Sequence, residues 1–295
     1  MNFCKRLLMA GAIVFSCGLT CQAQSIYRAE EHHISVPRVP KKVIFAGDTI
    51  RFDRSDFYER MDRELIAFTY SHTNSILMLK RARRCFDQVV PILQLNGIPE
   101  DLKYLMAIES NLDPKALSPA GAAGLWQFMK TSGREAGLVI DDEVDERYNI
   151  EKETEAACSF LKKAYAKFGN WMTVAASYNG GQGGIARKLE DQKQTNAMDL
   201  WMVEETSRYM YRILVAKMFF ENPEAFGFCL APDELYPSHT VKETITTSGS
   251  IPSLVDFALS HGVSYKQLKE ANLWLRDNKL VNKSGHTYSI VIPGE

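Results

Sequence analysis

The sequence has little net charge. Its 295 residues include 35 lysines and arginines against 36 aspartates and glutamates, a formal net charge of -1 at pH 7. A chain so balanced has no overall field that would steer it toward nucleic acid or anionic lipid, although local patches are compatible with this balance. We therefore expect no nucleic-acid partner. Disorder is not expected either, because 45% hydrophobic and 24% charged residues are ordinary values for a globular protein.

Motifs for metals and cofactors are missing as well. The six histidines show no metal-ligand spacing and no HExxH pattern. The acidic run 141–146 is a poor calcium loop without the EF-hand glycine and terminal glutamate, so we interpret it as a solvated loop. Residues 181–186 fit the dinucleotide fingerprint G-x-G-x-x-A, but they follow a helical pattern with no surrounding βαβ unit. We expect no metal and no cofactor.

The N-terminus has no hydrophobic run long enough to cross a bilayer comfortably. The apolar run 7–15 follows Lys5 and Arg6 and is succeeded by the sequence Cys-Gln-Ala at 21–23. A positive region, a short apolar region and a small-x-small site are typical of a secretory signal peptide over residues 1–23. The mature chain is then expected to begin near Gln24 and to lie in the periplasm.

Cysteines are too few for a disulfide scaffold. Cleavage after residue 23 leaves Cys85, Cys158 and Cys229, and an odd number means at least one thiol unpaired within the chain. One disulfide among the three is possible. Cys158 is expected in the core because it lies on an apolar helix face. Lipid anchoring at Cys17 or Cys21 is the less favoured alternative, since the preceding residues match a lipoprotein site poorly. The oligomeric state is left undecided.

The sequence pattern divides the chain into regions. Residues 24–54 are polar and contain Pro37 and Pro40, which suggests an extended N-terminal arm. Apolar residues at helical spacing recur over 55–234, so this region is expected to form a mainly α domain. Residues 235–295 change to a strand, helix, helix, strand pattern, which predicts a small βααβ module of its own.

One glutamate stands out in the helical region. Leu102, Leu105 and Met106 lie on one face of a predicted helix, and Glu109 is the next position on that face. Because Asn111 and the proline three residues later end the helix, Glu109 is also near the negative end of the helix dipole. Both desolvation and the dipole favour the neutral acid, which is the state of a general acid. A glutamate that reaches water or pairs with a cation is the alternative.

Three sequence motifs follow one another in a fixed order. They are Glu109-Ser110 with Ser118-Pro-Ala-Gly-Ala-Ala-Gly-Leu-Trp-Gln127-Phe-Met, then Ser177-Tyr178-Asn179-Gly-Gly, then Glu205-Thr206 with Tyr209. Together they resemble the motif set of the family 1 lytic transglycosylases, strongly over residues 99–220. The tryptophan before Gln127 and the trailing module are most similar to the membrane-bound D branch of that family. The resemblance implies a lysozyme-like helical catalytic domain acting on peptidoglycan.

The resemblance also implies roles for individual residues. Glu109 matches the catalytic glutamate. The other matching positions are substrate-binding residues of the cleft: Ser118, Gln127, Tyr178, Asn179, Glu205 and Tyr209. Ser177 stands where the family often has alanine, and this departure touches no catalytic position. Trp126 and Phe128 could line the glycan, though such residues are more often part of a core.

The chemistry of these residues is consistent with that family. Glycoside cleavage usually needs two carboxylates, whereas the segments around Glu109 supply Gln, Ser, Tyr and Asn. One carboxylate suits a substrate that provides its own nucleophile, and the 6-hydroxyl of N-acetylmuramic acid can do so, giving a 1,6-anhydro product. Glu109 would act first as acid and then as base. The alternatives are a muramidase that uses water and a non-catalytic wall-binding protein.

The C-terminal region resembles a LysM module. Residues 251–254, Gly262, Ser264, Leu268 and Asn272 occur in the expected order, with a closing strand before Pro293. The resemblance implies glycan binding, and a structural appendage that only packs on the helical domain remains an equal alternative.

Overall fold

The computed structural model describes residues 36–294 of the chain. The expected signal peptide over 1–23, the start near Gln24 and the possible anchors Cys17 and Cys21 lie outside these residues. The helices and strands, in chain order, are β1 Lys42–Phe45, β2 Asp48–Arg51, α1 Ser55–Tyr70, α2 His72–Leu95, η1 Glu100–Leu102, α3 Lys103–Ser110, α4 Lys130–Glu135, η2 Glu146–Tyr148, α5 Ile150–Phe168, α6 Trp171–Gly180, α7 Gln182–Asp191, η3 Ala197–Asp199, α8 Glu204–Glu221, η4 Pro223–Phe226, η5 Pro232–Glu234, β3 Val241–Thr247, α9 Leu254–Ser260, α10 Tyr265–Ala271 and β4 Tyr288–Pro293.

Part of the expected N-terminal arm is a β-hairpin. Strands β1 and β2 pair antiparallel, and both residues of the connecting turn, Ala46 and Gly47, have positive φ, as a tight hairpin turn requires. Val43, Phe45 and Ile50 are buried in the main core, whereas Ile44, between the first two, points outward and is 53% exposed. The segment therefore differs from the extended arm expected from its prolines and polar residues, because every second side chain of β1 is buried and anchors the hairpin in the main core.

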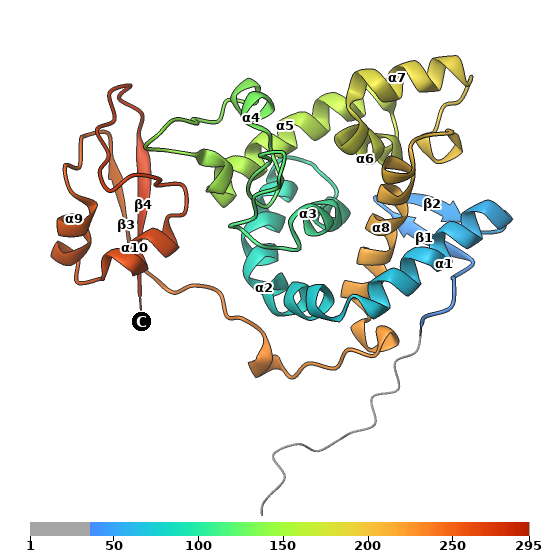
Figure 1. Ribbon diagram of the computed structural model, residues 1–295, viewed down its shortest axis with the longest axis horizontal. Helices are drawn as coiled ribbons and strands as arrows, with labels where there is room; N and C mark the ends of the chain where they lie inside the picture. Colours follow the sequence, from blue (N-terminus) through green and yellow to red (C-terminus); the bar gives the residue numbers. More distant parts are fainter. Residues whose placement is uncertain (1–35, 295) are drawn as a thin grey trace, which may run out of the picture. The chain divides into compact units, whose positions relative to one another are not determined.

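Helix α3 lies in the middle of the helical region, where α2, α5, α6 and α8 surround it (Figure 1). The sequence 104–108 is Tyr-Leu-Met-Ala-Ile, and all five residues are buried. The helix is thus buried on all sides of this stretch, rather than along the single stripe expected from the pattern. The mainly α fold predicted from periodicity is confirmed, and α3 holds Glu109 in its last turn.

The main core is built from buried apolar residues of the helices and of the β1–β2 hairpin. Helix α5 ends at Gly169, which has φ of +72° and closes the helix in the left-handed conformation. Cys158, predicted to be a core residue, is fully buried in α5. The three described cysteines, Cys85, Cys158 and Cys229, are all free thiols, and the first two are buried.

The C-terminal module has the predicted βααβ order. Strands β3 and β4 pair antiparallel, with Ile245 opposite Ile290. Helix α9 begins at Ser253, whose hydroxyl accepts from the N–H of Asp256, and α10 begins with a capping box of Ser264 and Gln267. The buried Asn272 ties α10 to β4, because its amide donates to the carbonyl of Val291 and accepts from the N–H of the same residue.

The acidic run 141–146 is only partly the solvated loop expected from its charge: Asp141 and Asp142 are exposed, whereas residues 144–146 are buried. Val144 bridges Leu275 of the module, and its side chain is 1% exposed within the module's core. One Glu143 carboxylate oxygen accepts from the N–H groups of Val281 and Asn282. The prediction was wrong for residues 144–146 because Val144 pairs with Leu275, far along the chain, and local charge does not reveal such a pairing.

The next two acidic residues of that run are also buried. Asp145 forms an ion pair with Arg147, with 2.7 Å between Oδ2 and Nη2. The same guanidinium donates to the carbonyls of Gly121 and Phe128. Arg147 thus joins the run that contacts the module to the 116–128 segment of the predicted site.

Candidate active site

Glu109 is held at an abrupt helix end. Asn111 and Leu112 follow it with φ of +52° and +54°, so the chain leaves α3 through two left-handed residues. Both neighbours of Glu109 are buried, whereas Glu109 itself is partly exposed. The helix therefore presents a carboxyl at the edge of an apolar core, as the sequence predicted.

The carboxyl of Glu109 has one hydrogen-bond donor among residues 36–294. The hydroxyl of Tyr209 on α8 donates to Oε1 over 2.5 Å. Desolvation by the surrounding core raises the pKa of Glu109, and the Tyr209 hydrogen bond and the charge of Arg212 partly offset this. The charge of Glu205 raises the pKa further. Because Tyr209 binds Oε1 as an acceptor, the proton of the neutral acid belongs on Oε2, which is available to a ligand.

Tyr178 lies near the same acid, and its hydroxyl is already used. The hydroxyl donates to the backbone carbonyl of Trp126 over 2.7 Å. Its ring packs against the rings of Trp126, Phe128 and Phe160. Burial raises the pKa of Tyr178 well above its usual range, and the charge of Glu109 adds to this effect. Tyr178 thus supports the loop facing the acid and carries no spare hydroxyl proton.

The loop that carries Gln127 is tightly constrained. Gln127 has φ of +51°, and its side-chain amide donates to the carbonyl of Gly124 over 2.8 Å. Gly124 has φ of +83°, and a Cβ there would lie 1.7 Å from the carbonyl oxygen of Arg147. Only glycine fits such a position. Trp126 and Phe128, considered as glycan-lining aromatics, are instead buried core residues with 0% and 5% exposure.

Sequence reasoning missed Glu153, a fully buried acid behind this loop. Its Oε2 accepts from the N–H of Trp126 over 3.0 Å, while Oε1 is buried with no hydrogen-bond partner among the described residues. Desolvation raises the pKa of Glu153 well above its usual range, which favours the neutral acid. Because Tyr178 donates to the carbonyl of Trp126, Glu153 and Tyr178 hydrogen-bond to consecutive peptide groups of the loop. The signal was present: Glu153 lies four residues before Ala157 on the apolar face of α5.

The remaining predicted residues lie in the same region in different ways. The Asn179 amide oxygen accepts from the Thr206 hydroxyl over 2.8 Å, joining the end of α6 to α8. The Ser118 hydroxyl accepts from the N–H of Ala122 within its own loop. Glu205 is exposed in the first turn of α8. Glu109, Tyr178 and Tyr209 are therefore brought together, while the Ser118 hydroxyl is hydrogen-bonded within its own loop.

No group of three metal-ligating side chains occurs among residues 36–294. Within the same residues, no helix combines the length and apolar character needed to cross a bilayer.

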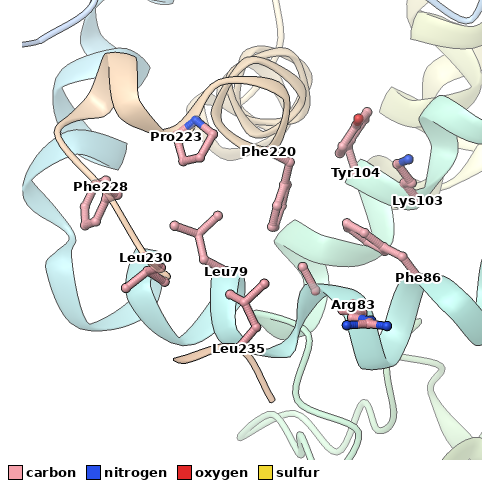
Figure 2. Close-up of a pocket in the computed structure, with 11 residues that line it drawn as sticks. Leu79, Arg83, Phe86, Lys103, Tyr104, Phe220, Pro223, Phe228, Leu230 and Leu235 are labelled. Carbon is pink, nitrogen blue, oxygen red and sulfur yellow. The ribbon is translucent and has the colours of Figure 1, made fainter. Parts of the chain in front are cut away.

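The apolar pocket of Figure 2, about 310 Å³, lies at the start of α3 beside Tyr104 and Phe220, whereas Glu109 is in the last turn. It is lined mainly by apolar side chains and does not include Glu109.

Two family descriptions match consecutive parts of the chain. Residues 93–200 match the "Transglycosylase SLT domain", and this range contains Glu109, Gln127 and Tyr178. Residues 243–295 match the "Soluble lytic transglycosylase C-terminal LysM-like domain". The chain carries an SLT domain followed by a LysM-like domain. Glu205 and Tyr209 lie beyond the matched part of the SLT domain, on the helix that completes the site.

Several curated proteins are similar to this chain in sequence. The chain is 25% identical over 255 residues to "Membrane-bound lytic murein transglycosylase D" of Escherichia coli K12, covering 84% of this chain and 54% of the relative. It is 35% identical over 127 residues to "Peptidoglycan transglycosylase gp16" of Escherichia phage T7, covering 41% of this chain and 10% of that protein. The chain thus spans about half the length of the first relative.

Solved structures give a more distant likeness. An inactive mutant of the lytic transglycosylase Slt from Pseudomonas aeruginosa is 20% identical, with a TM-score of 0.40, over 52% of this chain and 26% of that one. The 70 kDa soluble lytic transglycosylase of Escherichia coli is 18% identical, with a TM-score of 0.40, over 59% and 33% of the two chains.

Proposed function

We propose that this protein is a peptidoglycan lytic transglycosylase that cleaves the β-1,4 bond between N-acetylmuramic acid and N-acetylglucosamine without water. The observation that carries the proposal is Glu109: a partly exposed carboxyl with a raised pKa, hydrogen-bonded by Tyr209 on one oxygen, within an SLT domain. The relatives named as murein or peptidoglycan transglycosylases support the substrate class.

In the proposed reaction, Glu109 Oε2 donates its proton to the glycosidic oxygen as the bond from that oxygen to C1 breaks. The 6-hydroxyl of the same muramic acid then attacks C1, and the new bond closes a 1,6-anhydro ring. The Glu109 carboxylate accepts the proton of that hydroxyl, which restores the acid. Tyr209 remains on Oε1 throughout and stabilises the carboxylate stage with a charge-assisted hydrogen bond.

The other residues of the site position the substrate and the loop in this proposal. Gln127 and Ser118 line the cleft, and Asn179 and Tyr178 support the wall facing Glu109. Their hydrogen bonds to backbone and to Thr206 support a pre-organised wall, because the groups need no rearrangement before catalysis.

Glu205 favours a second candidate, a muramidase that uses water. It is an exposed carboxylate whose charge acts on Glu109, as the base of a two-carboxylate hydrolase would. Mass spectrometry of a sacculus digest distinguishes the two reactions. Transglycosylation gives anhydro-muramic ends that are lighter by one water, whereas reducing muramic ends would establish the hydrolase.

We further propose the division of the chain as signal peptide 1–23, an N-terminal segment 24–54 that includes the β1–β2 hairpin, catalytic domain 55–234 and LysM-like module 235–295, acting in the periplasm. The module is proposed to bind glycan strands. Intact-mass measurement of exported protein tests the start near Gln24. A retained Met1 would contradict it, and a lipid-sized mass on Cys17 or Cys21 would establish an anchor.

A further inference from the structure

A small cavity of about 210 Å³ lies beside the helix end that carries Glu109. It is formed between the end of α1, the start of α2, the end of α3 and one face of α8. Its polar lining includes Glu64, Asn74, Asn111, Arg208 and Arg212, and apolar side chains such as Ile108 complete it. We call these five polar residues and the space between them the arginine pocket.

Arg208 is fixed in this pocket by a buried acid. Its Nε and Nη2 donate to the two carboxylate oxygens of Glu64 over 2.6 and 3.1 Å. The Glu64 side chain is only 2% exposed, whereas that of Arg208 is 35% exposed. Such a two-point contact holds the guanidinium plane in one orientation. The third nitrogen, Nη1, has no partner among the described residues and remains available to a ligand.

Arg212 is one helical turn further along α8 and has no such partner. It is partly exposed, and within residues 36–294 it makes no hydrogen bond or ion pair. Two arginines and one glutamate leave the pocket with one positive charge in excess. Arginine binds carboxylates through paired N–H groups, so this excess favours a ligand that carries a carboxylate.

The arginine pocket adjoins the proposed reaction centre. Ile108 and Asn111 lie on either side of Glu109 in sequence, and Arg208 and Arg212 lie on either side of Tyr209. The charge of Arg212 also acts on the Glu109 carboxyl. A group bound in this pocket would therefore lie beside the helix end that carries Glu109, within reach of a substrate bound at that residue.

We propose that the arginine pocket binds a free carboxylate of the peptide stem attached to muramic acid. This inference rests on the proposed function. The sugar backbone of peptidoglycan is uncharged, because the lactyl carboxyl of each muramic acid is bonded to its stem as an amide. The free carboxylates of the polymer lie in the stems. A pre-positioned guanidinium and an unpartnered one thus match the stem and have no counterpart in the sugars.

Arg212 is the residue to change. Replacing Arg208 would leave Glu64 buried and unpaired, so loss of folding would obscure the result. We compare wild type, Arg212→Gln and Arg187→Gln, an exposed arginine on α7 that serves as the matched control. The substrates are soluble glycan chains with native stems and the same chains with stem carboxylates converted to neutral methylamides.

On native chains, Arg212→Gln is expected to raise KM about tenfold, the usual effect of losing one charged hydrogen bond. On neutralised chains, wild type should already have the raised KM, and the substitution should change it little. Loss of Arg212 also alters the pKa of Glu109, but that effect acts on both chain types equally. The readout is therefore the ratio of the two KM values. Arg187→Gln should keep the wild-type ratio.

Equal KM values for wild type on both chains would overturn the inference while leaving the proposed function intact. So would an Arg212→Gln defect of the same size on both chains, which would make Arg212 only a neighbour of Glu109. Chains stripped of stems carry only lactyl carboxylates. If Arg212→Gln raises the KM for these stripped chains as much as for native chains, the stem is not the ligand. If wild type cleaves no chain at all, the proposed function itself fails.

Discussion

The helical region and the C-terminal module bury very different kinds of residue. The core of the module over 241–293 contains a single buried polar side chain among the described residues, Asn272, and its amide is hydrogen-bonded on both sides. The helical region buries several ionisable groups, and three of them are carboxyl groups near the proposed site or its neighbouring pocket: Glu64, Glu153 and, in part, Glu109.

This difference distinguishes residues that stabilise the fold from residues that the proposed function requires. Buried ionisable groups cost free energy, so a region that only had to fold would replace them with apolar residues. The helical region keeps them where a neutral acid, a fixed loop and a fixed arginine are needed. Among the described residues 241–293, the core of the module contains no carboxyl, lysine or arginine side chain, and its one buried ionisable group is the phenol of Tyr288, which is consistent with a role through its surface. Each of the following predictions tests one side of this comparison, beginning with the largest expected effect.

Replacing Glu109 with Gln should remove activity while preserving the fold. The amide is nearly the same size but cannot donate the catalytic proton, so turnover should fall by about a thousandfold or more. Melting temperature should stay the same or rise, because no buried charge pair is broken. Turnover of soluble glycan chains and thermal melting measure the two effects.

Glu205→Gln is the control for this change. In a transglycosylase it should lower turnover far less than Glu109→Gln. Comparable losses in both variants would identify a two-carboxylate hydrolase, and full activity in Glu109→Gln would remove Glu109 from the mechanism.

Replacing Tyr209 with Phe should lower turnover by about ten- to a hundredfold, because one hydrogen bond to a charged group is lost. The Tyr209 hydroxyl lowers the pKa of Glu109, so its removal raises that pKa. A general acid works only below its pKa, and the loss of activity at high pH should therefore move to higher pH. A pH–rate profile measures this shift. A profile that moves to lower pH would contradict the assigned hydrogen bond.

Replacing Glu153 with Gln should change how stability depends on pH. The folded-state pKa of Glu153 is raised well above 4.5. Its contribution is therefore fully present below about pH 4 and is lost as pH rises toward the folded pKa. The variant cannot ionise, so its melting temperature relative to wild type should increase with pH. Glu155→Gln, an exposed position on the same helix, should show no such trend. Parallel curves of melting temperature against pH for Glu153→Gln and wild type would mean that the pKa of Glu153 is not raised in the folded state.

Replacing Glu143 with Ala should have the smallest effect. It removes the acceptor for the N–H groups of Val281 and Asn282 and should cost about 1 kcal/mol of stability. Turnover of soluble chains should stay at the wild-type level. Binding to sacculi should also be kept if the module binds through its surface. Lost turnover would show that the contact between the module and the run 141–146 positions the catalytic loop, through the ion pair of Asp145 and Arg147.

The sequence by itself determined the helical class, the βααβ order of the module and the position of Glu109. These follow from local rules: apolar spacing of 3.6 residues, alternation in strands, and helix ends marked by Asn111 and Gly169. The sequence pattern also predicted a carboxyl in an apolar setting, because the stripe and the helix end are both local. Its motif order indicated Tyr209 and Tyr178 through resemblance.

Only the tertiary structure decided which groups meet. The hydroxyl of Tyr209 reaches Glu109 from a hundred residues away, and Glu153 supports the peptide of Trp126 from another helix. The acidic run around Val144 predicts a solvated loop, and the burial of Val144 is set only by its partner Leu275 in the module, far along the chain. Burial and hydrogen-bond partners depend on what packs against a residue. Local spacing records the face that a side chain occupies, and the fold determines what that face touches.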